Sequence, residues 1–156
     1  MADSERRLLR RAADYQFGSG AGRALFPETA DLSITHTSSG RPRQVSAGGE
    51  RLVTYASDGY FTLGLAGGRR LIETFDPPRL RVVVGDESAP YIREGRNAFA
   101  KFVQRADREI RPGDEIAVVH ADGDLLGVGR AELSGEGMLD FETGMAVKVR
   151  EGAGGE

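Results

Sequence analysis

The sequence predicts an α+β N-terminal domain, residues 1–78, followed by a small, mostly β pseudo-barrel, residues 79–156. Two observations lead to this division. The first half opens with a helical apolar stripe and continues with short β-type runs separated by glycine-containing turns. Pro77 and Pro78 then precede the β-branched run RVVV, which starts a second series of short strands. A chain of 156 residues is long enough for one domain or two small ones, and the prolines mark the expected boundary.

The first element expected is a helix over residues 3–16, which Asp3 and Ser4 can cap and which Gly18 ends. Its apolar stripe is formed by Leu8, Leu9, Ala12 and Ala13. The glycine-rich run FGSGAG, residues 17–22, has neither the preceding strand nor the Gly-Lys-Ser/Thr of a phosphate-binding loop. We therefore expect a flexible turn there.

Two pairs of arginines repeat at the one-turn spacing of this helix, Arg6 with Arg10 and Arg7 with Arg11. Like charges at this spacing repel each other by a few tenths of a kcal/mol, and cations near a helix start oppose its dipole. The four arginines can simply form a solvent-exposed helix face. The alternative is that an interaction stabilises them at this spacing.

Residues 32–65 have the composition of short antiparallel strands joined by tight turns. The β-type runs are LSITH, RQVS, RLVTYA and YFTLGL. A short helix then begins at Gly67, and its inward-facing residues are Leu71, Ile72 and Phe75. The DPP of residues 76–78 stops this helix.

The second half alternates more regularly. The runs RLRVVV, NAFAKFV and GMAVKVRE are expected as strands, and RPGDEIAVVHADGDLLGVGRAELS as a turn, a strand, an Asp-Gly-Asp hairpin and another strand. SAPYIREG is predicted to be a short helix, with Ser88 as its cap and Gly95 as its terminator, and GEGMLDF a helical turn. In NAFAKFV, Ala98, Ala100 and Phe102 face one way, and Phe99, Lys101 and Val103 the other. About five strands and two short helices are the proportions of a small, nearly closed barrel.

The composition excludes several kinds of site. The chain has no cysteine, so disulfides, thiolate nucleophiles and sulfur-based zinc sites are ruled out. His36 and His120 have no second ligand spaced for a metal, and surface or capping roles are expected for them. We expect no metal, no cofactor and no catalytic constellation. No apolar run approaches a membrane span and the N-terminus lacks a secretory signal, so a cytoplasmic location away from the membrane is expected.

Charge is segregated along the second half, although the whole chain carries a formal charge of −3. Residues 79–112 contain eight basic and five acidic side chains, whereas residues 113–144 contain one basic and eight acidic side chains. The basic stretch could serve a polyanionic partner. Acidic turns that keep a β protein soluble are the alternative explanation.

The ordered motifs EGRNAFAK, RPGDEIAVV, LLGVGRAELS and GMAVKVREG strongly resemble the archaeal type of PUA domain, named for pseudouridine synthases and archaeosine transglycosylase. The resemblance covers residues 79–152 and implies a PUA pseudo-barrel. The upstream segments ADYQFGSGAGRALFP, SSGRPRQV and SDGYFTLGLAGGRRL look like the small α/β domain that precedes the PUA domain in archaeosine tRNA-guanine transglycosylase. In that family the chemistry resides in a (β/α)₈ barrel with a cysteine-rich zinc site. This sequence has neither, so the enzymatic activity is not carried over.

The resemblance implies RNA binding, commonly to the acceptor end of tRNA, by the corner after the first helix of the PUA domain and by its last strand. The residues it picks out are Gly95, Arg96, Asn97, Ala98, Phe99, Lys101, Met145, Lys148 and Arg150. Part of this set is supported by residue chemistry alone. Arg96 and Asn97 can reach a phosphate or a 2′-hydroxyl, and Phe99 can stack on an unpaired base.

Alternative roles accompany these residues. Gly95 permits φ > 0 and a close backbone approach, but it can equally be only a helix cap. Either Phe99 or Phe102 is expected in the core. Lys148 and Arg150 lie two apart on one strand and are expected to share a face.

The sequence therefore predicts a non-catalytic RNA-binding protein, an accessory to tRNA modification. The other hypothesis is a protein-interaction subunit that docks onto a catalytic transglycosylase or another RNA-modification enzyme.

Overall fold

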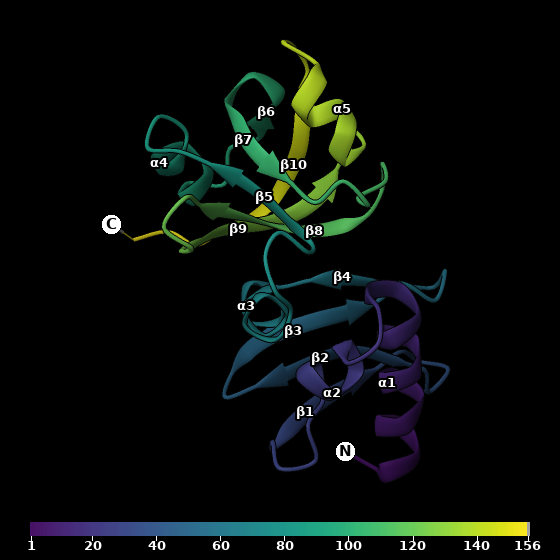
Figure 1. Ribbon diagram of the computed structural model, residues 1–156. Helices are drawn as coiled ribbons and strands as arrows, with labels where there is room; N and C mark the ends of the chain where they lie inside the picture. Colours follow the sequence, from purple (N-terminus) through teal and green to yellow (C-terminus); the bar gives the residue numbers. More distant parts are fainter. Residues whose placement is uncertain (156) are drawn as a thin grey trace. The chain divides into compact units, whose positions relative to one another are not determined.

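The computed structural model describes residues 1–155, and the chain divides into two compact units, Met1–Thr74 and a second that starts at Phe75. We call them the N-terminal unit and the C-terminal unit. Figure 1 shows a sheet with neighbouring helices in each unit.

The N-terminal unit combines three helices with a four-stranded sheet in the part of the chain that is described. Its elements are α1 (Asp3–Phe17), α2 (Ala21–Leu25), β1 (Leu32–His36), β2 (Pro42–Ala47), β3 (Glu50–Tyr55), β4 (Phe61–Leu63) and α3 (Leu65–Thr74). The strands pair in chain order and every pair is antiparallel. This arrangement confirms the predicted α+β character.

The start of the chain differs from the prediction in two ways. Ala2 occupies the N-cap position of α1 and no side chain caps the helix, so the expected capping by Asp3 and Ser4 is wrong. The buried face is formed by Leu9, Ala13 and Phe17. Leu8, which was expected in the apolar stripe, is 49% exposed.

The turn expected over residues 17–22 is confined to residues 18–20, because Phe17 still belongs to α1 and Ala21 begins α2. The backbone N–H of Gly22 donates to the Asp14 carboxylate at 2.7 Å. A Cβ at position 22 would clash with the backbone of Arg10, so glycine allows α2 to lie directly against α1. Gly22 therefore serves packing.

The C-terminal unit is built around a six-stranded sheet, counted over its described residues. Its elements are β5 (Arg81–Val84), α4 (Ala89–Arg93), β6 (Ala98–Phe99), the 3₁₀ turn η1 (Ala100–Phe102), β7 (Val103–Ala106), β8 (Glu115–His120), β9 (Leu125–Ala131), α5 (Gly135–Asp140) and β10 (Met145–Gly152). The strand order is β6-β10-β9-β8-β5-β7. The two edge strands, β6 and β7, are joined only by η1, so the sheet curls into the nearly closed barrel that was predicted (Figure 1).

The single strand expected at residues 97–103 is wrong, because the chain changes partners within it. β6 pairs with β10, whereas β7 pairs with β5 at the other edge of the sheet. η1 interrupts the extended backbone between them and makes the step from one edge of the sheet to the other. The predicted alternation survives only up to Lys101, since Ala98 and Ala100 are buried while Phe99 and Lys101 are exposed, but Phe102 does not join the two alanines in the core.

The core of the C-terminal unit is aliphatic. Among its members are Val82, Val84, Ile92, Ile116, Val118, Leu126, Met138 and Val147. Neither aromatic residue of the corner belongs to it: Phe99 is 45% exposed and Phe102 is half-buried. The expectation that one of them is a core residue is therefore wrong, and both remain at the surface of the unit.

Candidate nucleic-acid interface

The corner begins where α4 ends. Gly95 has a φ of 95°, in the left-handed region, and its backbone N–H donates to the Ile92 carbonyl at 2.9 Å. A Cβ at position 95 would have no neighbour within 4 Å. Glycine is therefore required here by backbone conformation and not by crowding. The turn that it makes carries the chain from α4 into β6.

Two hollows of similar size meet at the exposed aromatic side chains of this corner. The first, of about 400 Å³, is lined by Phe99, Lys101, Phe102, Glu142, Thr143 and Gly144. The second, of about 380 Å³, extends towards α4, and Tyr91, Arg96 and Asn97 line it together with Phe99 and Phe102. The two phenylalanines thus separate neighbouring concave surfaces, which we call the corner hollows.

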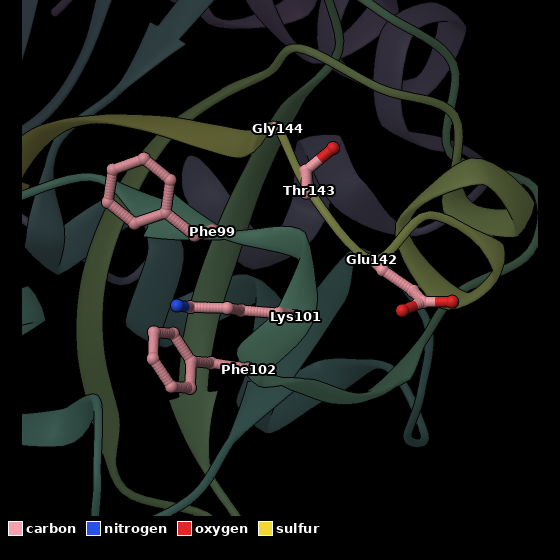
Figure 2. A pocket seen from close by; sticks show the side chains of 6 residues that line it. All are labelled: Phe99, Lys101, Phe102, Glu142, Thr143 and Gly144. Carbon is pink, nitrogen blue, oxygen red and sulfur yellow. The ribbon is translucent and has the colours of Figure 1, made fainter.

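Each corner hollow has a cation next to an aromatic ring. The Lys101 ammonium lies 5.0 Å from the centroid of the Phe102 ring, and Figure 2 shows it between the rings of Phe99 and Phe102. The Arg96 guanidinium lies 5.6 Å from the centroid of the Tyr91 ring and 3.5 Å from the Glu94 carboxylate. The Arg96 side chain is 68% exposed, so this exposed ion pair does not hold it firmly.

The closing strand β10 begins directly after Gly144, which lines the first hollow. Met145 pairs with Phe99, and the Ala100 backbone N–H donates to the Gly144 carbonyl at 2.9 Å. Further along the strand, Lys148 is exposed and lies opposite Arg130 of β9. The Arg130 guanidinium in turn lies 3.0 Å from the Glu132 carboxylate.

Three predicted site residues are committed to contacts within the protein. The side-chain oxygen of Asn97 accepts a hydrogen bond from the backbone N–H of Val149 at 3.0 Å. Arg150 donates through two nitrogens to the carboxylate of Glu115, one of the contacts being 3.1 Å long, and Glu115 is only 6% exposed. Ala98 is 2% exposed. These residues shape the surface, while Arg96, Phe99, Lys101 and Lys148 present their side chains to solvent.

Several residues that line the corner hollows lie outside the set predicted from the sequence. Tyr91, 53% exposed, is predicted there only as part of a short helix, and Phe102 as one of two candidates for the core. Glu142 and Thr143 belong to the segment between α5 and β10, which Figure 2 shows across the hollow from Lys101. A signal existed for Tyr91, because the residues at i−3, i+3 and i+4 from it are Ser88, Glu94 and Gly95, none of which is a large apolar side chain.

The two histidines form ion pairs at the surface. His120 Nε2 lies 2.6 Å from a carboxylate oxygen of Asp86, and Nδ1 lies 3.0 Å from one of Asp122. The hydrogen bond with Asp86 raises the pKa of His120 above its ordinary value, although partial desolvation acts against it. His36 Nε2 lies 2.6 Å from the Glu5 carboxylate.

Two kinds of feature are missing from residues 1–155. These residues contain no group of three His, Cys, Asp or Glu side chains arranged to hold a metal ion. They also contain no helix that is long and apolar enough to cross a membrane.

Two families match the chain, one for each unit. The family described as the patch-forming domain C2 of tRNA-guanine transglycosylase matches residues 7–78, and the PUA domain family matches residues 80–153. The tRNA-guanine(15) transglycosylase of Thermococcus kodakarensis is 46% identical over 148 residues, which are 94% of this chain and 25% of that protein. The enzyme of the same name from Pyrococcus furiosus is 48% identical over 141 residues, 90% of this chain and 23% of that protein. The chain thus spans about a quarter of the length of these relatives.

Solved structures share the fold at lower identity. A hypothetical protein from Pyrococcus horikoshii superposes with a TM-score of 0.76 at 21% identity, over 98% of this chain and 92% of that one. A conserved PUA domain protein from Thermoplasma acidophilum gives a TM-score of 0.69 at 22% identity, over 100% of this chain and 93% of that one. At this level of identity they show the fold alone.

Proposed function

The chain carries a patch-forming C2 domain of the tRNA-guanine transglycosylase type followed by a PUA domain, and from this premise we propose that it is a non-catalytic protein that binds RNA at the corner hollows. Both units of the chain match the C-terminal region of archaeal tRNA-guanine(15) transglycosylases in sequence.

One observation carries the proposal: two adjacent hollows meet at Phe99 and Phe102, and each has a cation beside an aromatic ring. Single-stranded RNA offers bases that stack on aromatic side chains and phosphates that bind cations. Stacking contributes about 1–3 kcal/mol per base, and each phosphate contact adds a salt-dependent increment. The arrangement is suited to unpaired nucleotides rather than to a closed duplex.

We propose tRNA as the ligand, bound near its acceptor end, because the relatives are named as enzymes that act on tRNA. The protein would serve as an accessory to tRNA modification in the cytoplasm. Its relatives are about four times longer, and the family resemblance assigns their chemistry to a barrel domain outside the matching region.

Titration of fluorescently labelled tRNA at several salt concentrations tests this function. We expect binding at low salt that weakens steeply as salt rises, because phosphate contacts release counterions. Measurement at 50 mM and 200 mM salt would suffice to detect the trend. If labelled tRNA does not bind even at the lower concentration, the proposal fails.

The second candidate function is docking onto a catalytic protein. The observation that favours it is the ratio of lengths, since the relatives contain in one chain both this region and a further three quarters of polypeptide. Co-purification with a separate transglycosylase or another RNA-modification enzyme would support this function. A monomer that binds tRNA unaided, and that no enzyme accompanies, would count against it.

A further inference from the structure

The geometry points to a protein-docking surface on the exposed face of α1, formed by Arg7, Leu8, Arg11 and Tyr15, which we call the α1 ridge. Its partner would be a protein with an apolar groove whose rim carries carboxylates. This inference concerns the N-terminal unit and does not depend on RNA binding by the C-terminal unit.

The α1 ridge lies opposite the buried face of the helix. Successive residues of an α-helix are 100° apart, which places the ridge on the side away from Leu9, Ala13 and Phe17. Tyr15 is 82% exposed and Leu8 is 49% exposed. Two large side chains with apolar bodies therefore stand in solvent one above the other, two turns apart.

The two arginine pairs of α1 differ in their contacts. One pair is hydrogen-bonded within the unit, and the other pair is exposed. Arg6 donates to the Pro27 carbonyl, and Arg10 donates to the Phe26 carbonyl at 2.8 Å, so both are held within the unit. Arg7 and Arg11 are exposed and make no hydrogen bond or ion pair with any residue between 1 and 155. No ion pair within the described chain offsets their mutual repulsion, although Asp3 and Asp14 stand one helical turn from Arg7 and Arg11 respectively.

The spacing of the α1 ridge fits a groove on a protein. Leu8, Arg11 and Tyr15 occupy positions i, i+3 and i+7, the pattern of a helix that lays one face into an apolar groove. Tyr and Arg are the side chains that most often anchor protein interfaces. The two exposed guanidinium groups lie next to the apolar anchors, so carboxylates on the rim of the groove would complement their charge.

Other occupants fit less well. In a two-fold contact between two copies, α1 would face α1, and the arginines of one copy would approach those of the other. RNA would use Arg7 and Arg11, but it gives the aliphatic Leu8 no partner that favours its burial. The charge pattern and the apolar anchors together favour an acidic-rimmed protein.

The test uses the full chain with a photo-crosslinking amino acid, p-benzoylphenylalanine, in place of Tyr15, produced in the cells from which the sequence comes. The matched control carries it in place of Arg43, an exposed residue of β2 outside the α1 ridge. We expect the Tyr15 position alone to yield one protein adduct, which mass spectrometry identifies. The purified partner should then bind the wild-type chain, and carboxylates should line the crosslinked groove.

Charge reversal distinguishes the ridge from a chance contact. Arg7→Glu and Arg11→Glu should each weaken the purified complex by about tenfold or more, whereas Arg43→Glu should leave it unchanged. A nuclease-sensitive adduct, an adduct with a second copy of the chain, or no adduct at position 15 would overturn the inference. Leu8→Ala with Tyr15→Ala should leave tRNA binding intact, so the two proposals fail separately.

Discussion

The side-chain oxygen of Asn97 accepts a hydrogen bond from the backbone N–H of Val149, at 3.0 Å and across 52 positions of sequence. This bond joins the corner after α4 to the closing strand β10 beside an irregularity in its pairing with β9, between Val149 and Glu151. Both sides of the proposed RNA surface therefore depend on one amide side chain that does not itself need to touch RNA.

Asn97→Ala should destabilise the C-terminal unit by about 1–3 kcal/mol, because the Val149 N–H is left without its acceptor in a buried strand. Hydrogen exchange of the Val149 amide, compared with amides of β8, measures the effect locally. Asn97→Asp is the matched control, since a carboxylate oxygen can still accept this bond. Equal protection of Val149 in the alanine variant and the wild type would refute the structural role.

Arg150→Ala should destabilise the C-terminal unit more than Glu115→Ala does. Removing Arg150 leaves a carboxylate that is 6% exposed without this partner, whereas removing Glu115 leaves a guanidinium that can turn to water. The cost of Arg150→Ala should lie below the roughly 3–5 kcal/mol of a fully buried pair, because the Arg150 side chain is 35% exposed.

Urea denaturation of the two single variants and the double variant measures this asymmetry. Arg150→Lys keeps the charge but loses the two-nitrogen contact, so it should fall between the wild type and Arg150→Ala. If Glu115→Ala proves the more damaging change, Glu115 has a further structural role that outweighs its pairing with Arg150.

The architecture was predictable where one local pattern decides an element. The β-branched run of β5 and the alternating pattern of β10 correctly indicate strands, and the apolar stripe of α1 correctly indicates a helix. The break of residues 97–103 into β6, η1 and β7 was not predictable, because the competing edges of the sheet, β10 and β5, lie far away in the sequence. Tertiary pairing overrides local alternation there.

The sequence predicted that the corner and the last strand lie together, but not which of their side chains bind within the protein. Sequence selects the corner and the last strand, and the structure places Phe99 and Met145 opposite each other. It could not reveal that Asn97 and Arg150 contact partners 52 and 35 positions away. A polar side chain near a site can hydrogen-bond within the protein or with a ligand. Only the folded structure shows whether a residue distant in the sequence is its partner.

The imidazole of His120 should titrate above its ordinary value of 6.5, since the hydrogen bond to Asp86 raises the pKa and favours the charged ring. A folded-state pKa above the unfolded one means that the stabilisation is fully present below about pH 6.5 and is lost as the pH rises through the folded pKa. NMR titration of the His120 ring protons measures this directly. Asp86→Asn should move the midpoint back towards 6.5, whereas Asp140→Asn, at the exposed end of α5, should not. An unchanged midpoint in Asp86→Asn would rule out this pairing in solution.

Phe99→Ala and Lys101→Ala should weaken tRNA binding in different ways, if both side chains line the bound segment as proposed. Loss of the Phe99 ring removes stacking worth about 1–3 kcal/mol, roughly 5- to 150-fold in Kd, and leaves the salt dependence unchanged. Loss of the Lys101 ammonium removes one phosphate contact, so the slope of log Kd against log salt should fall by about 0.7 for a single strand.

Each variant has a matched control. Tyr60→Ala removes an exposed aromatic residue of the N-terminal unit and is the control for Phe99→Ala. Arg105→Ala removes an exposed cation on β7 and is the control for Lys101→Ala. Parallel losses in both variants, with equal slopes, would mean that the corner hollows do not hold a stacked base beside a phosphate.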